Sequence, residues 1–349
     1  MSFRKQFGGK LTKEIIAQYE QSPNWKNGAF ENIEPVDMSM GLTKMPGIIY
    51  KQLSNRKVRQ PQKSLPIQAF DQKAFLKNSD QAQMIWYGHS VLLLRMGGLT
   101  ILIDPMLGNN TTPIAPMPTK RFSENTLQLI DAFPEIDLVL LTHDHYDHLD
   151  YASIEKLRRK VKQWGVALGV KRHLEYWGVA GTTITEFDWW QVMTIGSLNF
   201  TFTPTRHFAG RGLRDRNKSF WGGWVLESPQ EKIWFSGDGG YGKHFKEIGQ
   251  RLGPFDFALL ECGQYNDDWA EIHLFPQECI KAALDTGTKN IMPVHWGGFA
   301  LSYQHTWQDP AEDFVKAAEA AQLHYTLPRL GEIFNAQDQI TEKWWRDFD

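Results

Sequence analysis

Residues 140–150, LLTHDHYDHLD, place four nitrogen or oxygen donor side chains within six positions, directly after the apolar run Ile136–Leu141. They are His143, His145, Asp147 and His148. Residues two apart in a helix point in different directions, so this spacing does not suit one helical face. In an extended segment residues two apart share one side, and a turn after them can bring His148 inward. The segment is therefore predicted to be a loop at the end of a strand.

The donor types in this loop suit a divalent metal ion. Imidazole and carboxylate are ligands that a borderline cation such as Zn²⁺ accepts, and no cysteine lies near them to form a structural thiolate site. Four donors could serve one ion, but steric crowding favours their division between two neighbouring ions. A pair of ions needs further ligands from elsewhere in the chain.

Three more donors follow apolar runs in the same way. His207 ends FTFTPTRH, Asp238 ends IWFSGD and His295 ends IMPVH. A single histidine after a strand is more commonly hydrogen-bonded in a core than bound to metal. Because all three recur at the same position relative to a strand as the first loop does, a metal centre is the favoured interpretation.

The segment GDGGYGKH, residues 237–244, has a second interpretation. It nearly matches the phosphate-binding loop of nucleotide-binding proteins, which has a glycine, four residues, and then glycine and lysine. That pattern requires serine or threonine next, to hold Mg²⁺, and His244 stands there. Because the metal interpretation also uses Asp238, we favour it over nucleotide binding.

The rest of the chain has the pattern of an α/β protein. Short apolar runs bounded by Gly, Pro, Asp or Asn predict buried strands within residues 84–96, 99–107, 136–143, 198–205, 222–228, 232–238, 257–263 and 290–297. Helical patterns are interleaved with them, over residues 12–20, 150–164 with Asp150 as N-cap, 244–251, 276–285 and 310–321. This alternation predicts layered sheets covered by helices. Residues 1–80 are polar and irregular, and we expect an N-terminal strap on a main domain of residues 81–349.

Composition excludes several classes of function. A net charge of −2 and a pI near 6.6 give no sequence-wide attraction for nucleic acid. The only two cysteines, Cys262 and Cys279, argue against a disulfide framework and fit a reducing compartment. The N-terminal residues lack a secretory apolar core, and no stretch approaches the roughly 20 apolar residues of a membrane span. We expect a cytoplasmic protein, for which peripheral contact with a membrane stays open.

The motifs together resemble a known family. THDHYDHLD carries the signature of the metallo-β-lactamase superfamily, and His207, Asp238 and His295 follow in the order of its later motifs. One branch is most similar, the N-acylphosphatidylethanolamine-hydrolysing phospholipases D. Its motifs are matched between Trp86 and Leu301 by GHSVLLLR, LIDPML, HYDHLDY, EFDWW, FTPTRH, WGGW, GDGGY, IGQRLGPFD and HWGGFAL.

The resemblance implies a four-layer αββα sandwich with two metal ions at the sheet edge. By matching positions, the first ion would be held by His143, His145 and His207. The second would be held by Asp147, His148 and His295, and Asp238 would bridge both. The expected ions are two Zn²⁺, with manganese or iron as alternatives. Histidine at position 145 favours hydrolysis over redox chemistry, because diiron relatives that reduce oxygen usually have glutamate there.

A metal pair would make hydroxide available near neutral pH, since two divalent ions sharing a water lower its pKa. We expect this bridging hydroxide to attack phosphorus, with Asp147 and Asp238 acting in catalysis through the ions they hold. His273, in EIHLFPQE, matches a family histidine near the substrate phosphate and is the third expected catalytic residue. Its alternative role is that of a histidine at the start of a helix.

Three further side chains are candidates around the centre. Asp104, in LIDP, is expected to brace a ligand histidine from outside, or to be only a turn residue before Pro105. Lys120 and Arg121 end the long loop 108–122 and could meet a phosphate, although solvated charges are the commoner outcome. His89 is expected to be a structural hydrogen-bonding residue and not a ligand.

The leading functional hypothesis is a dinuclear phosphodiesterase of the phospholipase D type that acts on N-acylphosphatidylethanolamine-like lipids. The alternative is a hydrolase of the same fold acting on a soluble phosphodiester or a lactone. An inactive interaction module is disfavoured, because a dead site has no reason to keep seven buried donors together. A lipid substrate requires an exposed apolar rim, for which residues 40–50, MGLTKMPGIIY, are a candidate.

Overall fold

The computed structural model describes residues 3–36, 57–112, 119–212 and 214–348, together with Gly47 and Tyr50. Most of the expected apolar rim and the middle of the loop 108–122 lie outside these residues. Two seven-stranded sheets form the centre of the described structure. The division of the chain at residue 80 stays a prediction.

The first sheet has the strand order β16-β3-β4-β5-β6-β7-β8. Its strands are β3 (Gln83–Trp86), β4 (Leu92–Met96), β5 (Leu99–Ile103), β6 (Ile136–Leu141), β7 (Val161–Ala167), β8 (Ile184–Phe187) and β16 (Ile333–Phe334). Pairing is antiparallel from β16 to β5 and parallel from β5 to β8. The parallel half therefore directs the carboxyl ends of β5 and β6 to one edge of the sheet.

The second sheet repeats this plan, in the order β15-β14-β13-β12-β11-β10-β9. Its strands are β9 (Val192–Ile195), β10 (Leu198–Thr203), β11 (Gly223–Glu227), β12 (Lys232–Phe235), β13 (Phe257–Glu261), β14 (Asn290–Val294) and β15 (His324–Tyr325). Pairing is antiparallel from β9 to β12 and parallel from β12 to β15. The carboxyl ends of β12, β13 and β14 consequently also lie at one edge.

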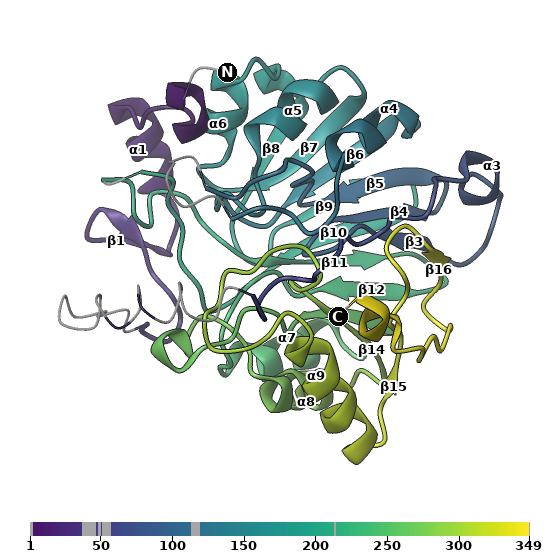
Figure 1. The fold of residues 1–349 in the computed structure, drawn as a ribbon. Helices are drawn as coiled ribbons and strands as arrows, with labels where there is room; N and C mark the ends of the chain where they lie inside the picture. Colours follow the sequence, from purple (N-terminus) through teal and green to yellow (C-terminus); the bar gives the residue numbers. More distant parts are fainter. Residues whose placement is uncertain are drawn as a thin grey trace.

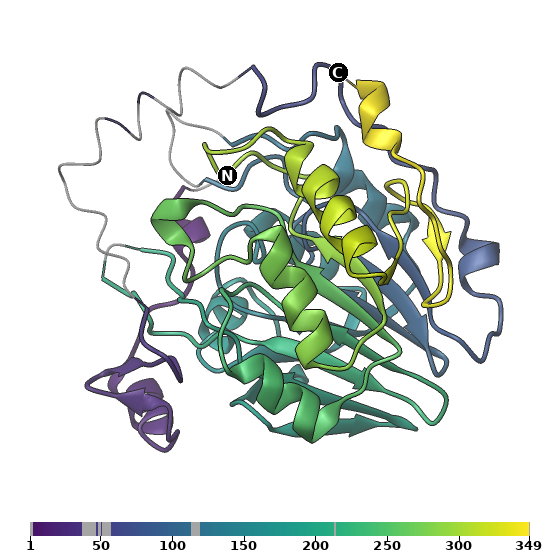
Figure 2. The same cartoon turned by 90° about the horizontal axis from the view of Figure 1, so that it is seen from below.

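Helices cover both outer faces of the two sheets, as Figure 1 shows. On one side lie α4 (Leu129–Ala132), α5 (Tyr151–Leu157) and α6 (Lys171–Tyr176). On the other side lie α7 (His244–Leu252), α8 (Pro276–Asp285) and α9 (Asp309–Ala320), which stand in front of the sheets in Figure 2. This is the predicted four-layer αββα sandwich.

Shorter elements complete the described structure. They are the helices α1 (Lys13–Tyr19) and α3 (Gln72–Phe75), the 3₁₀ turns η1 (Phe3–Phe7), η3 (Thr126–Gln128), η4 (Gly181–Thr183), η5 (Asp267–Trp269) and η6 (Trp344–Phe348), and the hairpin strands β1 (Trp25–Lys26) and β2 (Ala29–Phe30). None of the helices within the described ranges has the length and apolar character needed to cross a bilayer.

Aromatic side chains fill the space between the sheets. Trp224 of the second sheet packs edge-on against Phe187 of the first, with ring centroids 5.1 Å apart. Its indole N–H reaches the backbone oxygen of Leu141 at 3.3 Å, so its polar atom is paired although the ring is fully buried. Trp189 is also a core residue, and its indole donates to the backbone oxygen of Trp221 at 2.7 Å. These contacts join the two sheets.

The prediction of a helix over residues 150–164 is wrong in its second half. Asp150 does cap the helix, accepting from the backbone N–H of Ser153 at 2.9 Å, but α5 ends at Leu157. Residues 161–167 instead form β7, paired on one side with β6 and on the other with β8. The apolar residues Ile154, Leu157 and Trp164, which are buried, and Val161, which is half-buried, fit a helical period. Only the pairing with strands on both sides makes the second half a strand. The other four predicted helices are confirmed to within two residues.

Candidate metal centre

The loop after β6 is held to the end of β5 by Asp104. The carboxylate of Asp104 accepts from the Thr142 backbone N–H at 2.8 Å and from the Thr142 hydroxyl at 2.6 Å. It is fully buried and adopts a left-handed φ of 41° directly before Pro105. The two strand ends are therefore tied at the residue just before His143.

A first group of donors is formed by His143, His145 and His207. His143 Nε2 lies 2.9 Å from His145 Nδ1, and His207 Nε2 lies 3.2 Å from the same atom. His143 and His207 are buried, while His145 is half-buried. The ring nitrogens of the three residues thus converge on one point.

A second group contains Asp147, His148, Asp238 and His295. His295 Nε2 lies 3.2 Å from Asp147 Oδ2 and 2.9 Å from Asp238 Oδ2. His148 Nε2 lies 3.0 Å from Asp238 Oδ2 and 3.6 Å from Asp147 Oδ2. Asp238 also groups with His143, so its carboxylate lies between the two sets of donors. The structure brings all seven sequence-predicted residues together at one edge of the sandwich.

The outward-facing nitrogens of His143, His148 and His207 are paired with oxygen atoms. His148 Nδ1 lies 2.7 Å from Asp104 Oδ2, and His207 Nδ1 lies 3.1 Å from the backbone oxygen of Ile272. His143 Nδ1 lies 2.9 Å from the Thr142 hydroxyl, whose own proton is directed to Asp104. In a neutral imidazole, an acceptor on the outer nitrogen places the proton there and leaves the inner nitrogen with a free lone pair. The inner nitrogens are therefore oriented as metal ligands are.

The donor set fits divalent metal ions. With metal–nitrogen bonds of about 2.0–2.1 Å, two ligands at neighbouring corners of a tetrahedron lie about 3.3 Å apart. The contacts of 2.9 Å and 3.2 Å within the first group are near that separation. Buried nitrogen lone pairs so close together repel each other unless a positive charge lies between them. Histidine and carboxylate donors without sulfur suit zinc, manganese or iron.

The two groups of donors differ in the direction of their pKa shifts. Burial lowers the pKa of His143, His145 and His207, which favours neutral, metal-competent imidazoles. Burial also acts against a proton on His148, but the carboxylates of Asp238, Asp147 and Asp104 outweigh it and raise the His148 pKa to about 10. Burial also acts against a proton on His295, but the neighbouring carboxylates, with Asp238 contributing most, outweigh it and raise the pKa of His295 well above its usual value. In the metal-free protein, protons on the second group thus balance the carboxylates.

Sequence reasoning missed Glu261, the last residue of β13. Its carboxylate is buried and lies 3.2 Å from His273 Nδ1 and 3.3 Å from His295 Nδ1, and it accepts from the Leu274 backbone N–H at 2.6 Å. The available signal was an acidic residue directly after the apolar run FALL, the same signal that identified Asp238. Glu261 therefore stands behind His295 as Asp104 stands behind His148.

His273 lies within the centre, ahead of helix α8. Its ring stacks on His295, with centroids 5.2 Å apart and an interplanar angle of 17°. His273 is half-buried, and its position before Pro276 also agrees with a helix-start residue. Glu261 occupies its Nδ1 side.

Other sequence-predicted residues have different environments. His89 Nε2 lies 2.9 Å from Asp147 Oδ2, so it forms a hydrogen bond there, and it also lies among the donors of the second group. Its structural role stays a prediction. Lys120 is exposed, but the prediction that Arg121 is solvated or meets a phosphate is wrong. Arg121 is buried, donates to the backbone oxygens of Tyr87 and Met106, and covers the ring of Phe299. Unpaired carbonyls at chain turns, which no sequence pattern reveals, hold it inside.

The nucleotide-binding interpretation of GDGGYGKH finds no geometric support. Asp238 points into the donor cluster, and the backbone N–H of Lys243 donates to Glu34 Oε2 at 2.7 Å. A phosphate-binding loop requires its backbone N–H groups to face a common anion. At Lys243 the backbone N–H is already bonded to the Glu34 carboxylate and does not face an open anion site.

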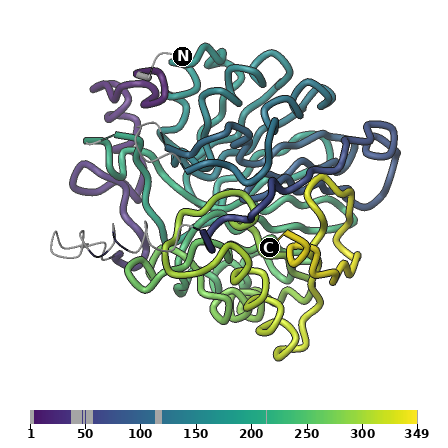
Figure 3. The backbone as a smooth tube through the Cα atoms, viewed as in Figure 1, coloured from purple at the N-terminus to yellow at the C-terminus, as the bar shows by residue number. Residues whose placement is uncertain are grey.

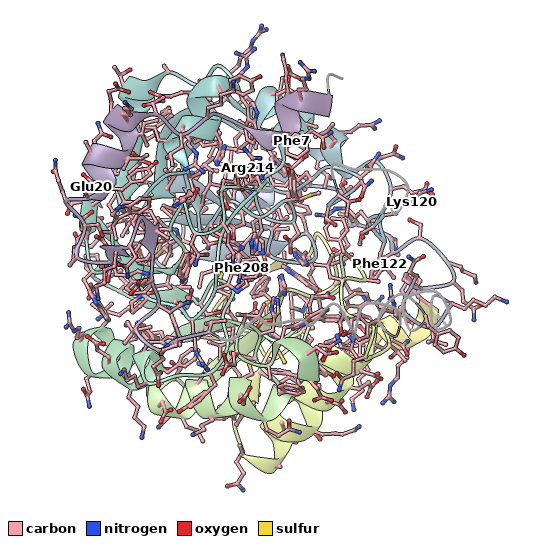
Figure 4. All side chains as sticks on the ribbon, turned by 90° about the vertical axis from the view of Figure 1, so that its left-hand side faces the viewer. Phe7, Glu20, Lys120, Phe122, Phe208 and Arg214 are labelled. Atoms are coloured by element: carbon pink, nitrogen blue, oxygen red, sulfur yellow. The ribbon has the colours of Figure 1, made fainter. Side chains whose placement is uncertain are left out.

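Half-buried residues mark the solvent side of the centre. His145, Asp147, His273 and Phe208 are each partly exposed. The ring of Phe208 packs on His145 with centroids 4.4 Å apart, and Figure 4 shows Phe208 near the middle of this face. The donor groups are therefore partly open to solvent on the side of Phe208 and His273.

Comparison with known proteins agrees with this geometry. A family model described as the beta-lactamase superfamily domain matches residues 100–296, more than half of the chain. The chain belongs to the metallo-β-lactamase superfamily. It is 34% identical over 344 residues to an uncharacterized protein of Mycobacterium tuberculosis, an alignment that covers 97% of this chain and 91% of the relative.

Two relatives carry the name of the phospholipase branch. The N-acyl-phosphatidylethanolamine-hydrolyzing phospholipase D 1 of Caenorhabditis elegans is 27% identical over 270 residues, with 73% of this chain and 76% of the relative covered. The mitochondrial protein of that name from Saccharomyces cerevisiae is 34% identical over 244 residues, covering 67% of this chain and 51% of the relative. The resemblance predicted from the motifs is confirmed.

Among solved structures, Igni18, a metallo hydrolase from Ignicoccus hospitalis, has a TM-score of 0.58 and 20% identity. The match covers 73% of this chain and 97% of that one, and it confirms the fold. The family, the relatives and the donor cluster together support a metal-dependent hydrolase.

Substitution of single donors tests the division into two groups. We expect His145→Ala to remove metal from the first group together with activity. Asp238→Asn should leave a folded protein with fewer than two metal ions per chain, since it withdraws the charge between the groups. Elemental analysis of the purified variants measures both. The control is His324→Ala, an exposed histidine of β15, which should keep two ions; two ions and full turnover in either centre variant would contradict the assignment.

Metal binding should depend steeply on pH. The raised pKa values of His148 and His295 mean that both hold protons in the metal-free protein at neutral pH, and a ligand must be neutral. Binding therefore releases about two protons, and log Kd should rise by about two for each unit that the pH falls between about 6 and 8. Calorimetric titration with Zn²⁺ in buffers of different ionisation enthalpy counts the protons. Binding without proton release would show that these two histidines are not protonated in the metal-free protein.

Proposed function

We propose that the protein is a dinuclear metal-dependent phosphodiesterase of the phospholipase D type, acting on N-acylphosphatidylethanolamine-like lipids. The observation that carries this proposal is the pair of donor groups that share Asp238 at one sheet edge. In the proposed ligand set, His143, His145 and His207 hold one ion. Asp147, His148 and His295 would hold the other, and Asp238 would be shared between them.

The chemistry expected of such a centre is hydrolysis at phosphorus. Divalent ions held there supply Lewis acidity toward a phosphoryl oxygen and lower the pKa of water. The oxygen of water forms the new bond to phosphorus, and the bond between phosphorus and the N-acylethanolamine oxygen breaks. One proton of the water ends on that leaving oxygen, so the products are an N-acylethanolamine and a phosphatidic acid.

The chain's own residues keep the reacting groups in place. Asp104 and Glu261 hold the outer nitrogens of His148 and His295, which fixes both rings with Nε2 beside Asp238 Oδ2. The fully buried positions of these residues exclude water from behind the centre. The reaction is thereby confined to the side where His145, Asp147 and His273 are partly exposed.

His273 is proposed to exchange a proton with the leaving oxygen or to orient the phosphodiester. Glu261 accepts from its Nδ1 side, so Nε2 is the nitrogen that remains for the substrate. Stacking on His295 holds the ring next to the metal ligands without requiring His273 to be one.

The lipid substrate class is supported by the relatives. Two of them are named as hydrolysing N-acyl-phosphatidylethanolamine, and they match two thirds or more of this chain. A lipid substrate further requires that the protein meet a membrane or micelle surface, at least transiently.

A substrate panel tests the proposal. The zinc-loaded protein is given N-palmitoyl-phosphatidylethanolamine in mixed micelles, bis(p-nitrophenyl) phosphate, and a homoserine lactone. We expect release of N-palmitoylethanolamine and phosphatidic acid, with loss of turnover on chelation and recovery on adding Zn²⁺ or Mn²⁺. In ¹⁸O-water the label should enter the phosphatidic acid. Turnover of only the soluble diester or the lactone would refute the lipid assignment, and label in the N-acylethanolamine would refute attack at phosphorus.

His273→Gln separates a catalytic role from a ligand role. We expect kcat to fall by about 10²- to 10⁴-fold, the usual contribution of a general acid or base, while two metal ions remain bound. Steady-state kinetics with elemental analysis on the same sample measures both. His324→Ala again serves as the control; a lost metal ion would make His273 a ligand, and unchanged kcat would leave it only a helix-start residue.

A further inference from the structure

We propose that the N-terminal segment, residues 3–9, is a positioning element of the metal centre. It holds the metal loop, residues 143–149, in its ligand-presenting conformation through His173 and Arg211. The inference rests on the proposed metal centre and adds a part of the chain that lies outside the family-model match, which begins at residue 100. The N-terminal segment lies beside α6 in Figure 1, and the tube in Figure 3 shows the same contact.

Asp144 lies between the ligands His143 and His145 and faces away from the donor groups. Its carboxylate is fully buried and accepts from the Ser219 hydroxyl at 2.5 Å and from the Gly210 backbone N–H at 2.8 Å. Gly210 follows His207 by three residues, so one carboxylate ties the metal loop to the loop that carries the third histidine. A displacement of Asp144 consequently moves the whole first donor group.

His173 of α6 connects this carboxylate to the N-terminal segment. The backbone N–H of Gly9 donates to His173 Nδ1 at 3.1 Å, and His173 Nε2 lies 3.2 Å from Asp144 Oδ2. A backbone N–H can only donate, so Nδ1 must be the unprotonated nitrogen of the ring. The proton then lies on Nε2, directed at Asp144. The seated segment thus sets the tautomer that Asp144 requires.

Arg211 makes a second, independent connection. Its guanidinium donates to the backbone oxygen of Gln6 at 3.0 and 2.7 Å, and to the backbone oxygens of Asp144 and Leu149 at 2.7 Å each. Arg211 is 3% exposed. One buried cation therefore binds the N-terminal segment and both ends of the metal loop at once.

The N-terminal segment fits closely against α6. The indole of Trp177 donates to the backbone oxygen of Lys5 at 2.7 Å. A Cβ on Gly8 would lie 1.9 Å from His173 Nδ1, and one on Gly9 would lie 2.1 Å from the backbone oxygen of Arg172. Only glycine permits this approach, and Gly8 also has a φ of +77°. A methyl group added at Gly8 or Gly9 is therefore expected to displace the N-terminal segment without altering a metal ligand.

Gly8→Ala is the direct test, and Gly28→Ala is its matched control. Both glycines have nearly the same positive φ, +77° and +78°, so alanine strains the backbone equally at each. Around Gly28 the nearest atom to a new Cβ is Lys218 Nζ at 3.8 Å, whereas at Gly8 it is the His173 ring. We expect Gly8→Ala to raise the Zn²⁺ dissociation constant by about tenfold, the lower range for loss of a group behind a ligand, and Gly28→Ala to leave it within about twofold.

The affinity is measured by competition with a chelator, and the visible spectrum of the cobalt-substituted protein reports the ligand geometry. Thermal unfolding of the metal-free proteins measures the general destabilisation of each variant and separates it from a change at the centre. If Gly8→Ala does not fold, a second pair of variants, both at His173, provides the test. His173→Leu loses both hydrogen bonds, while His173→Gln retains a donor and an acceptor and should recover most of the affinity.

The outcomes separate this inference from the proposed function. Wild-type affinity and an unchanged cobalt spectrum in Gly8→Ala and His173→Leu would overturn the positioning role, while the metal centre itself would stand. A cobalt spectrum altered equally in Gly8→Ala and Gly28→Ala would also overturn it, because strain alone would then explain the change. A wild-type protein that binds no divalent ion would overturn both proposals.

Discussion

The structure depends on the convergence of buried nitrogen and carboxylate donors at one edge of two sheets. His143 Nε2 and His207 Nε2 each lie about 3 Å from His145 Nδ1, which is unfavourable for neutral lone pairs without a cation between them. The fold supplies the convergence, because each sheet has a parallel half whose strands end at this edge. The oxygen acceptors behind the rings keep them pointed inward. Bringing these groups together has a free-energy cost. That cost is offset only when metal ions or protons supply positive charge between them.

Much of this centre could be predicted from the sequence, because each donor directly follows a strand-forming run. Asp238 and His295 are examples, since an apolar run, a short turn and a polar residue suffice to place them at a strand end. Glu261 also follows an apolar run, but the local sequence does not show that its carboxylate meets His273 and His295. Residues 161–167 could not be assigned, since their apolar spacing suits a helix and the neighbouring strands decide otherwise. Arg121 and Arg211 are held inside by backbone oxygens brought together by the tertiary fold, which a local pattern cannot reveal.

Some side chains behind the donors contact the ligand histidines directly, and others act on them through a second residue. Asp104 and Glu261 contact ligand histidines directly, whereas Asp144 acts on the backbone between two of them. Asp144 is held in turn by His173 and by the Gly210 backbone, and Arg211 joins its carbonyl to the N-terminal segment. Asp144, His173 and Arg211 are buried, so loss of a hydrogen bond among these side chains leaves an unpaired polar group. The N-terminal segment, remote in sequence, thereby becomes part of the same hydrogen-bonded unit as the metal loop.

The most direct test of the account is a crystal structure of the zinc-loaded protein with anomalous diffraction recorded at the zinc edge. The account predicts two anomalous peaks, about 3.5–4 Å apart as in other two-metal sites, with Asp238 between them. One peak should be surrounded by His143, His145 and His207, and the other by Asp147, His148 and His295. A single peak, a peak elsewhere on the surface, or side chains that point apart around an empty pocket would contradict it.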